Sequence, residues 1–297
     1  MQETSIIAGP ASHDLATRIA ARLEAQLVVS ELKVFSDGES KVRIGKTARN
    51  CVIVQSTYPP TDSHLLQALM LARKCADDGA RDVCAVIPYL AYARQDRPFL
   101  EGESVSMALL AKLLEASGVK HMITVDIHSP LAMSYFTSIG IQNVSSIPLL
   151  AEHAASMNLE KPLAVSPDAG GAQRAGAFAD CLGWESIALE KTRNRTTGEV
   201  SVRAELGASV SGRDAVLVDD MISSGLSIVR AAEVLRKNGA KRVVAMCAHA
   251  LMLGDAAQRI RAAGISDVIA TNSIPNEYAK VDLTDAISNA LVSRYGA

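Results

Sequence analysis

The feature that most constrains the fold of this chain is a unit of strand, loop, helix, glycine and strand that occurs twice. In the first copy, an apolar run at residues 52–54 precedes a polar loop and a helical pattern over residues 64–78. Gly79 and Ala80 then precede a second apolar run at residues 83–87. Because glycine suits the left-handed backbone position after a helix, this order predicts a helix that ends at Gly79 and connects two strands.

The second copy has the same order of elements. An apolar run at residues 216–218 precedes an acidic loop, a helix that extends to Asn238, Gly239 and a further apolar run at residues 243–248. A spacing of i, i+3, i+4 and i+7 places four apolar residues on one face of that helix: Ile228, Ala231, Ala232 and Leu235. Strands that alternate with helices of this length form parallel sheets covered on both faces, so we predict an α/β protein.

The same spacing predicts another helix, which Ser104 starts and Gly118 ends. Its buried face comprises Met107, Leu110, Ala111 and Leu114. The pattern of strands and helices restarts near residue 142, so we expect two similar α/β domains, at residues 1–142 and 143–297.

Composition excludes several classes of protein. The chain has 297 residues, of which 48% are hydrophobic, and a net charge of −2, which does not favour non-specific binding of nucleic acid. The five cysteines form no C-x-x-C pair, so neither a zinc site nor a disulfide framework is indicated. Neither a secretory signal nor a membrane span is predicted. These features together favour the reducing cytoplasm.

Two adjacent carboxylates, Asp219 and Asp220, follow the predicted strand at residues 216–218, and a loop of small residues precedes the next helix. In open α/β sheets, ligands bind outside the carboxyl ends of the strands, and backbone N–H groups at a helix N-terminus suit a phosphate. Carboxylates repel phosphate but accept hydrogen bonds from vicinal hydroxyls. The stretch therefore predicts a site for a sugar phosphate. The alternative is that the aspartates only cap the helix.

A histidine and a further aspartate also follow predicted strands. His128 comes after the apolar run at residues 122–125, and Asp168 comes after the run at 163–167, before Gly170 and Gly171. A glycine pair allows close approach of the backbone to an anion. Mg²⁺ prefers oxygen ligands and shares them with substrate phosphates, so a sparse metal site is one interpretation, and a purely structural role is the other.

Two basic clusters could neutralise phosphates. Arg94 and Arg97 flank Gln95 and Asp96 beside a strand end, where arginines can bind phosphates bidentately. Residues 191–198 form a basic, polar run that ends in a glycine. This run predicts either a solvated hairpin or a lid that brings positive charge over a reacting phosphate. Taken alone, the first cluster is more typical of an exposed, salt-bridged loop than of a phosphate site.

The whole set of motifs, in this order, resembles the ribose-phosphate pyrophosphokinases, also called PRPP synthetases. The resemblance covers nearly the whole chain. It rests on the turn at residues 35–39, which alone would be a surface hairpin, and on residues 88–97, 126–129, 166–171, 218–227 and Lys191 with Arg193. The short chain and the sequence around Lys191 are closest to the archaeal-type branch.

The resemblance implies two phosphoribosyltransferase-like domains related by a pseudo-twofold, with the C-terminal segment 281–297 packed on the first domain. It implies transfer of the diphosphoryl group of Mg-ATP to the 1-hydroxyl of ribose 5-phosphate, giving PRPP and AMP for nucleotide biosynthesis. A homo-oligomer is implied, in which a neighbouring subunit completes the adenine site. Neither nucleic acid nor a membrane is an expected partner.

The resemblance also assigns roles to residues. Lys191 and Arg193 would be catalytic, and His128 with Asp168 would bind Mg²⁺. The ATP site would comprise Phe35, Asp37, Glu39, Arg94 and Gln95. The ribose 5-phosphate site would comprise Arg193, Asp219, Asp220, Ser223, Ser224, Gly225, Leu226 and Ser227.

The phosphate loop departs from the commonest family pattern, Asp-Thr-Gly-Gly-Thr, because Ser223 replaces the acid and Leu226 replaces the second glycine. Two other functions are possible. A phosphoribosyltransferase that consumes PRPP would explain residues 218–227 but not the other motifs. A non-catalytic regulatory homologue could lose Lys191, Arg193 or His128, yet all three are present.

Overall fold

The computed structural model describes residues 3–193, 200–203 and 210–295, with only the backbone at 190–193 and 200–203. The chain divides into two compact units. Unit 1 comprises residues 1–145, 273–275 and 283–297, and unit 2 comprises residues 146–272 and 276–282. No helix within the described ranges is long and apolar enough to span a membrane.

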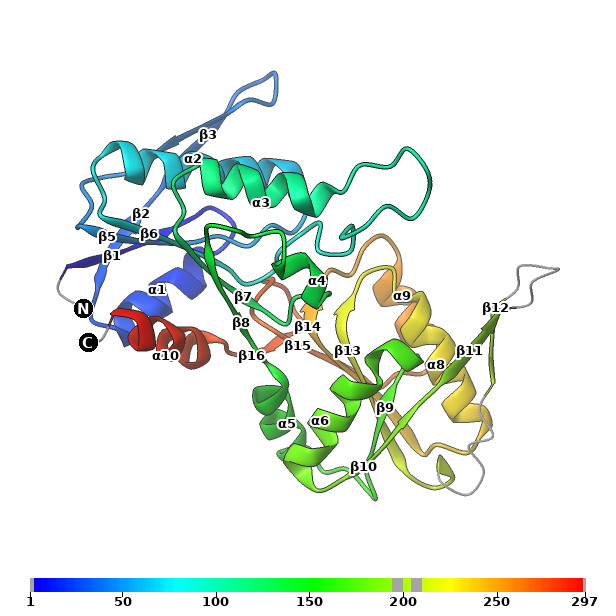
Figure 1. Ribbon diagram of the computed structural model, residues 1–297. Coiled ribbons are helices and arrows are strands. Elements are labelled where there is room, and N and C mark those ends of the chain that lie inside the picture. The colour runs from blue at the N-terminus through cyan, green and yellow to red at the C-terminus, as the bar shows by residue number, and fades with distance from the viewer. Residues whose placement is uncertain (1–2, 194–199, 204–209, 296–297) are drawn as a thin grey trace. The chain divides into compact units, whose positions relative to one another are not determined.

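Unit 1 contains a six-stranded parallel sheet in the order β2-β1-β5-β6-β7-β8. The strands are β1 (Thr4–Ala8), β2 (Gln26–Val29), β5 (Asn50–Val54), β6 (Asp82–Ile87), β7 (His121–Val125) and β8 (Gly140–Val144). The helices are α1 (His13–Arg22), α2 (Thr61–Asp77), α3 (Ser106–Ala116), α4 (Pro130–Met133) and α10 (Thr284–Tyr295). Figure 1 shows α2 and α3 on one face of this sheet, with α1 and α10 on the other.

Unit 2 contains a second six-stranded parallel sheet, in the order β10-β9-β13-β14-β15-β16. The strands are β9 (Leu163–Ser166), β10 (Glu185–Ala188), β13 (Asp214–Ile222), β14 (Arg242–Ala250), β15 (Asp267–Thr271) and β16 (Ala279–Val281). The helices are α5 (Ile147–Ala155), α6 (Ala172–Leu182), α8 (Leu226–Lys237) and α9 (Ala256–Ala262), with a short 3₁₀ helix, η1 (Ala169–Gly171).

Both faces of the second sheet bury apolar side chains. Ile228 of α8 and Ile260 of α9 pack with Leu217 on one face. Leu150 of α5 and Phe178 of α6 pack with Val216 on the other face. Adjacent residues of β13 thus serve opposite cores, as the pleat of a strand requires. The predicted α/β class, with two mainly parallel sheets flanked by helices, is confirmed.

Two antiparallel hairpins extend from these sheets. In unit 1, β3 (Glu31–Val34) pairs with β4 (Ser40–Arg43). In unit 2, β11 (Glu190–Arg193) pairs with β12 (Val200–Arg203). The first hairpin is visible as a projection beside α2 in Figure 1.

The repeated unit of the sequence corresponds to β5-α2-β6 in unit 1 and β13-α8-β14 in unit 2. All four residues of the predicted α8 face are buried. Gly239 has a φ of 86°, which is the left-handed position expected after this helix. The buried face of α3 is also as predicted, from Met107 to Leu114.

Two predictions about local structure are wrong. Ser104 does not start α3, because the residue before the helix is Val105, without a side-chain cap. The strand predicted at residues 216–218 is longer: β13 continues to Ile222 and includes both aspartates. Aspartate is rare in strands, so the strand was predicted to end before the two aspartates. Here β14 holds the extension, since Asp219 pairs with Cys247 and Met221 with His249.

Candidate active site

The acidic pair lies where β13 extends beyond one of its neighbours. The strand β9 pairs with β13 only from Ala215 to Leu217, whereas β14 accompanies it as far as Ile222. The side chain of Asp219 is 22% exposed and that of Asp220 is 6% exposed. Two carboxylates are therefore held at the carboxyl end of the sheet, which is where open α/β sheets bind ligands.

Arg174, which the sequence patterns did not single out, contacts both carboxylates. Its Nη1 lies 3.3 Å from Asp219 Oδ1 and 3.5 Å from Asp220 Oδ1. Burial and the neighbouring Asp220 raise the pKa of Asp219 to about 7, and Arg174 opposes that rise. The pair is a hydrogen-bond acceptor whose charge depends on this arginine. Arg174 is separated from the acids by 45 residues of sequence, so no local spacing connects them.

The loop after β13 leads directly into the N-terminus of α8. Gly225 is the N-cap residue of α8, with a φ of 75°, and no acidic residue occupies the first turn of the helix. The first N–H groups of a helix have no partner within the helix and attract anions. Ser223 and Ser224 are half-buried, and Leu226 and Ser227 are exposed at the helix start. A helix N-terminus of this kind can bind a phosphate, and the phosphate site itself stays a prediction.

The helix α9 and the residues just before it donate hydrogen bonds to the backbone of this loop. The Arg259 guanidinium donates a hydrogen bond of 3.0 Å to the carbonyl of Ser224, and the amide of Leu253 donates one to the carbonyl of Ser223. Both carbonyl oxygens thereby have donors within the protein, and the serine hydroxyls and the first N–H groups of α8 are the groups that could bind an anion. Arg259 is a second supporting residue that the sequence analysis missed, because its partner is a backbone atom.

Asp168 lies at the carboxyl end of β9, next to η1. Its Oδ1 accepts a hydrogen bond of 3.3 Å from the Gly171 amide, and its side chain is partly exposed. A Cβ atom on Gly171 would lie 2.5 Å from Ser166 Oγ, so the tight turn excludes larger residues. The close contact at this glycine is with the protein itself, and the approach of an anion to the glycine pair stays a prediction.

The loop after β6 contains the predicted ATP-binding residues of unit 1. Arg94 is exposed, and Gln95 is half-buried, where its Oε1 accepts a hydrogen bond from Ser106 of α3. Asp96 is buried and accepts hydrogen bonds from Arg97 Nε at 3.0 Å and Nη2 at 3.2 Å. These bonds, and a further one from Ser129, lower the pKa of Asp96 to about 2. Asp96 therefore anchors the loop, and Arg94 is left at its surface.

His128 lies in the next loop of unit 1, after β7, and is exposed. The preceding Asp126 has a φ of 38°, and the Ile127 amide donates to Asn143 Oδ1 at 3.0 Å. The Ser129 hydroxyl binds Asp96, so the residues on either side of His128 are held in place. An imidazole is thus presented at the carboxyl end of β7, as the sequence predicted.

The turn at Phe35 to Glu39 closes the β3–β4 hairpin, which agrees with the surface hairpin expected from its residues. Phe35 and Glu39 are paired through the backbone, with the Phe35 amide 2.9 Å from the Glu39 carbonyl. Asp37 Oδ1 accepts a hydrogen bond from the Glu39 amide at 3.1 Å. Phe35 is 40% exposed, and the Lys33 ammonium lies 4.8 Å from the centroid of its ring.

Lys191 and Arg193 lie on the strand β11, in register with Val202 and Val200 of β12, rather than in a loop from residue 191 onward. Their side chains, and residues 194–198 of the predicted lid, lie outside the described residues. The backbone pairing of β11 with β12 therefore places the first residues of this run in a β-hairpin.

The proposed metal ligands fall in different units, His128 in unit 1 and Asp168 in unit 2. Among the residues that the structure describes, no group of three or more histidine, cysteine or acidic side chains could hold a metal ion. The partly exposed carboxylate of Asp168 is an oxygen ligand of the kind that Mg²⁺ prefers, and Mg²⁺ keeps several water ligands and shares substrate phosphates. All five cysteines are free.

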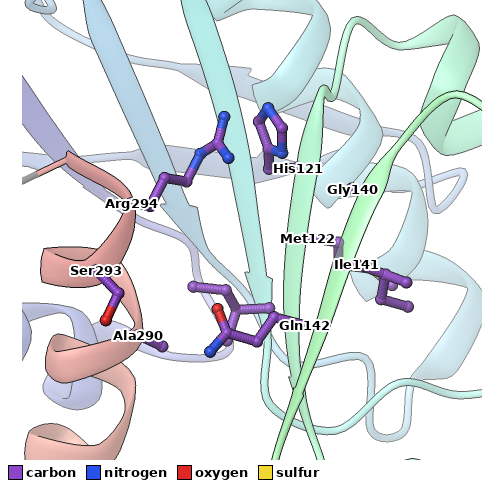
Figure 2. Close-up of a pocket in the computed structure, with 9 residues that line it drawn as sticks. His121, Met122, Gly140, Ile141, Gln142, Ala290, Ser293 and Arg294 are labelled. Carbon is purple, nitrogen blue, oxygen red and sulfur yellow. The ribbon is translucent and has the colours of Figure 1, made fainter.

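A pocket of about 310 Å³ lies elsewhere in unit 1, between the strands β7 and β8 and the helix α10. Figure 2 shows Arg294 of α10 reaching towards His121. Burial and Arg294 lower the pKa of His121. His121 is the first residue of β7, so this pocket opens at the amino end of the sheet. None of the predicted site residues lines it.

Comparison with known proteins identifies the family. A family model for the N-terminal domain of ribose phosphate pyrophosphokinase matches residues 4–118, and one for a phosphoribosyl synthetase-associated domain matches residues 185–291. A ribose-phosphate pyrophosphokinase of Methanobrevibacter smithii is 36% identical over 296 residues, covering 96% of this chain and 99% of that protein. This chain belongs to the ribose-phosphate pyrophosphokinase family.

Other relatives support the same family. The pyrophosphokinase of Sulfurisphaera tokodaii is 34% identical, over 94% of this chain and 96% of its own length. The pyrophosphokinase of Vibrio cholerae is 38% identical, over 92% of this chain and 88% of its own length. The crystal structure of the Mycobacterium smegmatis phosphoribosylpyrophosphate synthetase covers 99% of each chain with a TM-score of 0.87 at 28% identity. The nearly complete match to archaeal pyrophosphokinases agrees with the predicted archaeal-type branch.

Proposed function

We propose that this pyrophosphokinase family member transfers the β,γ-diphosphoryl group of ATP to the 1-hydroxyl of ribose 5-phosphate, releasing AMP and forming PRPP. The family match over 96% of the chain favours synthesis of PRPP over its use, and the observation that carries the sugar-phosphate site is the end of β13. There, a buried carboxylate pair and the N-terminus of α8 follow one another within seven residues, Asp219 to Gly225. Carboxylates accept hydrogen bonds from sugar hydroxyls, and the helix N-terminus attracts the 5-phosphate.

In this proposal, Asp219 and Asp220 bind the ribose hydroxyls, and the loop from Ser223 to Ser227 holds the 5-phosphate. The 1-hydroxyl oxygen attacks the β-phosphorus of ATP and releases its proton to water, the bond from that phosphorus to the α–β bridging oxygen breaks, and AMP departs. Such transfers need positioning and charge stabilisation more than covalent catalysis. Lys191 and Arg193 would supply positive charge to the transferring group, and Arg193 would also contact ribose 5-phosphate.

The ATP site would lie in unit 1. Arg94 would bind phosphate oxygens of ATP, since its guanidinium is exposed while Asp96 anchors the loop. Gln95 would contact the nucleotide from the same loop. The adenine would lie against Phe35, with Asp37 and Glu39, at the tip of the β3–β4 hairpin, in the active site of a neighbouring subunit of a homo-oligomer.

Mg²⁺ is the expected cofactor, held by His128 and Asp168. When bound, it would neutralise charge on the phosphate oxygens of ATP. Each ligand would come from the loop at the carboxyl end of its own strand, His128 after β7 and Asp168 after β9.

A direct assay tests the proposed function. The purified protein, shown to be folded by circular dichroism, is incubated with Mg-ATP and ribose 5-phosphate, and AMP and PRPP are measured. We expect AMP formation that depends on ribose 5-phosphate, with equimolar PRPP. Folded protein that forms no such AMP would contradict the proposal. A phosphoribosyltransferase would instead consume added PRPP, and the same assay with PRPP and a nucleobase separates the two activities.

A further inference from the structure

Arg174 occupies a position that helix stability does not explain. It lies in the first turn of α6, which begins at Ala172. The N-terminus of a helix carries partial positive charge and favours anions rather than cations. A cation there needs a compensating partner, and the two carboxylates at the end of β13 are such partners, at 3.3 and 3.5 Å.

The arginine is also enclosed by the site. Its side chain is 22% exposed, and a Cβ atom on Gly171 would lie 3.5 Å from its Nη1. Gly171 belongs to the turn after β9, where its amide donates a hydrogen bond to the Asp168 side chain. Arg174 therefore lies between that turn and the acidic pair, within a single unit.

The carboxylates need a cation to remain effective acceptors. Asp219 Oδ1 already accepts the amide of Asp220 at 2.9 Å, and both side chains are largely buried. Two adjacent buried carboxylates repel one another, and one of them would take up a proton without a nearby positive charge. A protonated carboxyl group loses acceptor capacity towards a hydroxyl.

We propose that Arg174 is a positioning residue for the sugar site: it holds Asp219 and Asp220 in place and stabilises their negative charge, so that they accept hydrogen bonds from the ribose hydroxyls. This inference rests on the proposed function and deepens it. In this arrangement, Asp219 and Asp220 contact the sugar, and Arg174 orients the two carboxylates.

The test measures ribose 5-phosphate binding by titration calorimetry from pH 6 to pH 9, alongside KM and kcat. We expect Arg174→Gln to weaken ribose 5-phosphate binding at pH 7 by about tenfold, the change that follows from losing a charged hydrogen bond of roughly 1.4 kcal/mol. The midpoint of its pH dependence should move to higher pH, while the KM for ATP stays the same. Arg174→Lys keeps the charge and should restore the wild-type midpoint.

Arg242→Gln is the matched control. Arg242 also pairs with an aspartate, Asp267 at 2.7 Å, but it begins β14 and lies at the opposite end of the strand from the site. We expect wild-type binding and an unchanged midpoint for this variant.

The outcomes separate the two proposals. Wild-type protein that binds ribose 5-phosphate, with equal affinity and equal pH midpoint in Arg174→Gln, would overturn the role of Arg174 alone. If Arg174→Gln does not fold, Arg174→Lys decides, because a midpoint displaced to higher pH in that variant, which keeps the positive charge, would also overturn it. Wild-type protein that does not bind ribose 5-phosphate would overturn the proposed function and this inference with it.

Discussion

The Ser129 hydroxyl donates a hydrogen bond to Asp96 Oδ2 and so joins the loop after β6 to the loop after β7. The two residues are 33 positions apart in the sequence. One loop carries Arg94 and Gln95, and the other carries His128. Asp96 thus couples the proposed nucleotide-binding residues to the proposed metal ligand within unit 1.

Asp96→Ala is expected to raise the KM for ATP and to lower the free energy of unfolding. The change leaves the Ser129 hydroxyl and Arg97 without their buried acceptor, and such a loss costs roughly 1–3 kcal/mol. Kinetics with varied ATP and urea unfolding measure the two effects. Asp77→Ala removes an exposed partner of Arg73 on α2 and should change neither. Equal effects of the two substitutions would argue against an anchoring role.

The bonds to Asp96 should also persist in mild acid. Hydrogen bonds from Arg97 and Ser129 lower its pKa to about 2. The stabilisation is present above the ordinary pKa of an aspartate, near 4, and is lost as the pH falls towards 2. The difference in unfolding free energy between wild type and Asp96→Asn should therefore shrink only below about pH 4. A difference that is constant from pH 6 to pH 2 would contradict the lowered pKa.

Lys191→Ala is predicted to lower kcat far more than it weakens ribose 5-phosphate binding. A cation that stabilises only the transferring group acts in the transition state and not on the bound sugar. Steady-state kinetics together with calorimetry distinguish the two effects. Lys241→Ala, which removes a surface pair with Glu160, serves as the control. An unchanged kcat in Lys191→Ala would mean that the catalytic charge lies elsewhere.

The KM for ribose 5-phosphate should fall as the pH rises through about 7. Burial and Asp220 raise the pKa of Asp219 to about 7, so the carboxyl group is protonated below that pH and becomes a full acceptor above it. Asp219→Asn should raise the KM and abolish this dependence. Asp267→Asn, which removes the ion pair between β15 and Arg242 of β14, should keep the pH dependence. A flat profile in the wild type would contradict the assignment.

The Gly225→Ala substitution should weaken ribose 5-phosphate binding and destabilise the protein. Gly225 has a φ of 75°, and an added Cβ would lie 3.1 Å from Ile260 Cδ1. Left-handed backbone alone costs a non-glycine residue roughly 1–2 kcal/mol. Gly183 has a similar φ of 67°, with no atom within 4 Å of its Cβ position, so Gly183→Ala should show the strain without the change in affinity. Loss of affinity in both variants would point to global destabilisation.

Mixing inactive Lys191→Ala chains with inactive Glu39→Ala chains should restore activity. If the adenine site is shared between subunits, a mixed oligomer contains sites with both residues intact. Mass spectrometry under native conditions confirms subunit exchange before the assay. No recovered activity after confirmed exchange would place the hairpin residues in the same subunit's site.

Part of the candidate site follows from local patterns. The carboxylate pair, the small-residue loop and the start of α8 are contiguous, so their proximity requires no tertiary information. The buried face of α8 follows from helical periodicity for the same reason. Local patterns do not predict that β13 extends through the aspartates. Aspartate has a low strand propensity, and pairing with β14 overrides it.

The sequence by itself determined the two βαβ units, the buried helix faces and the acidic loop before a helix, because each depends on residues close together in the chain. Three hydrogen bonds depended on the tertiary structure alone. Arg174 donates to Asp219, Arg259 donates to the Ser224 carbonyl, and the Ser129 hydroxyl donates to Asp96. These contacts join residues 33 to 45 positions apart. They exist because parallel strands bring their carboxyl ends, and the loops that follow them, to one edge of a sheet.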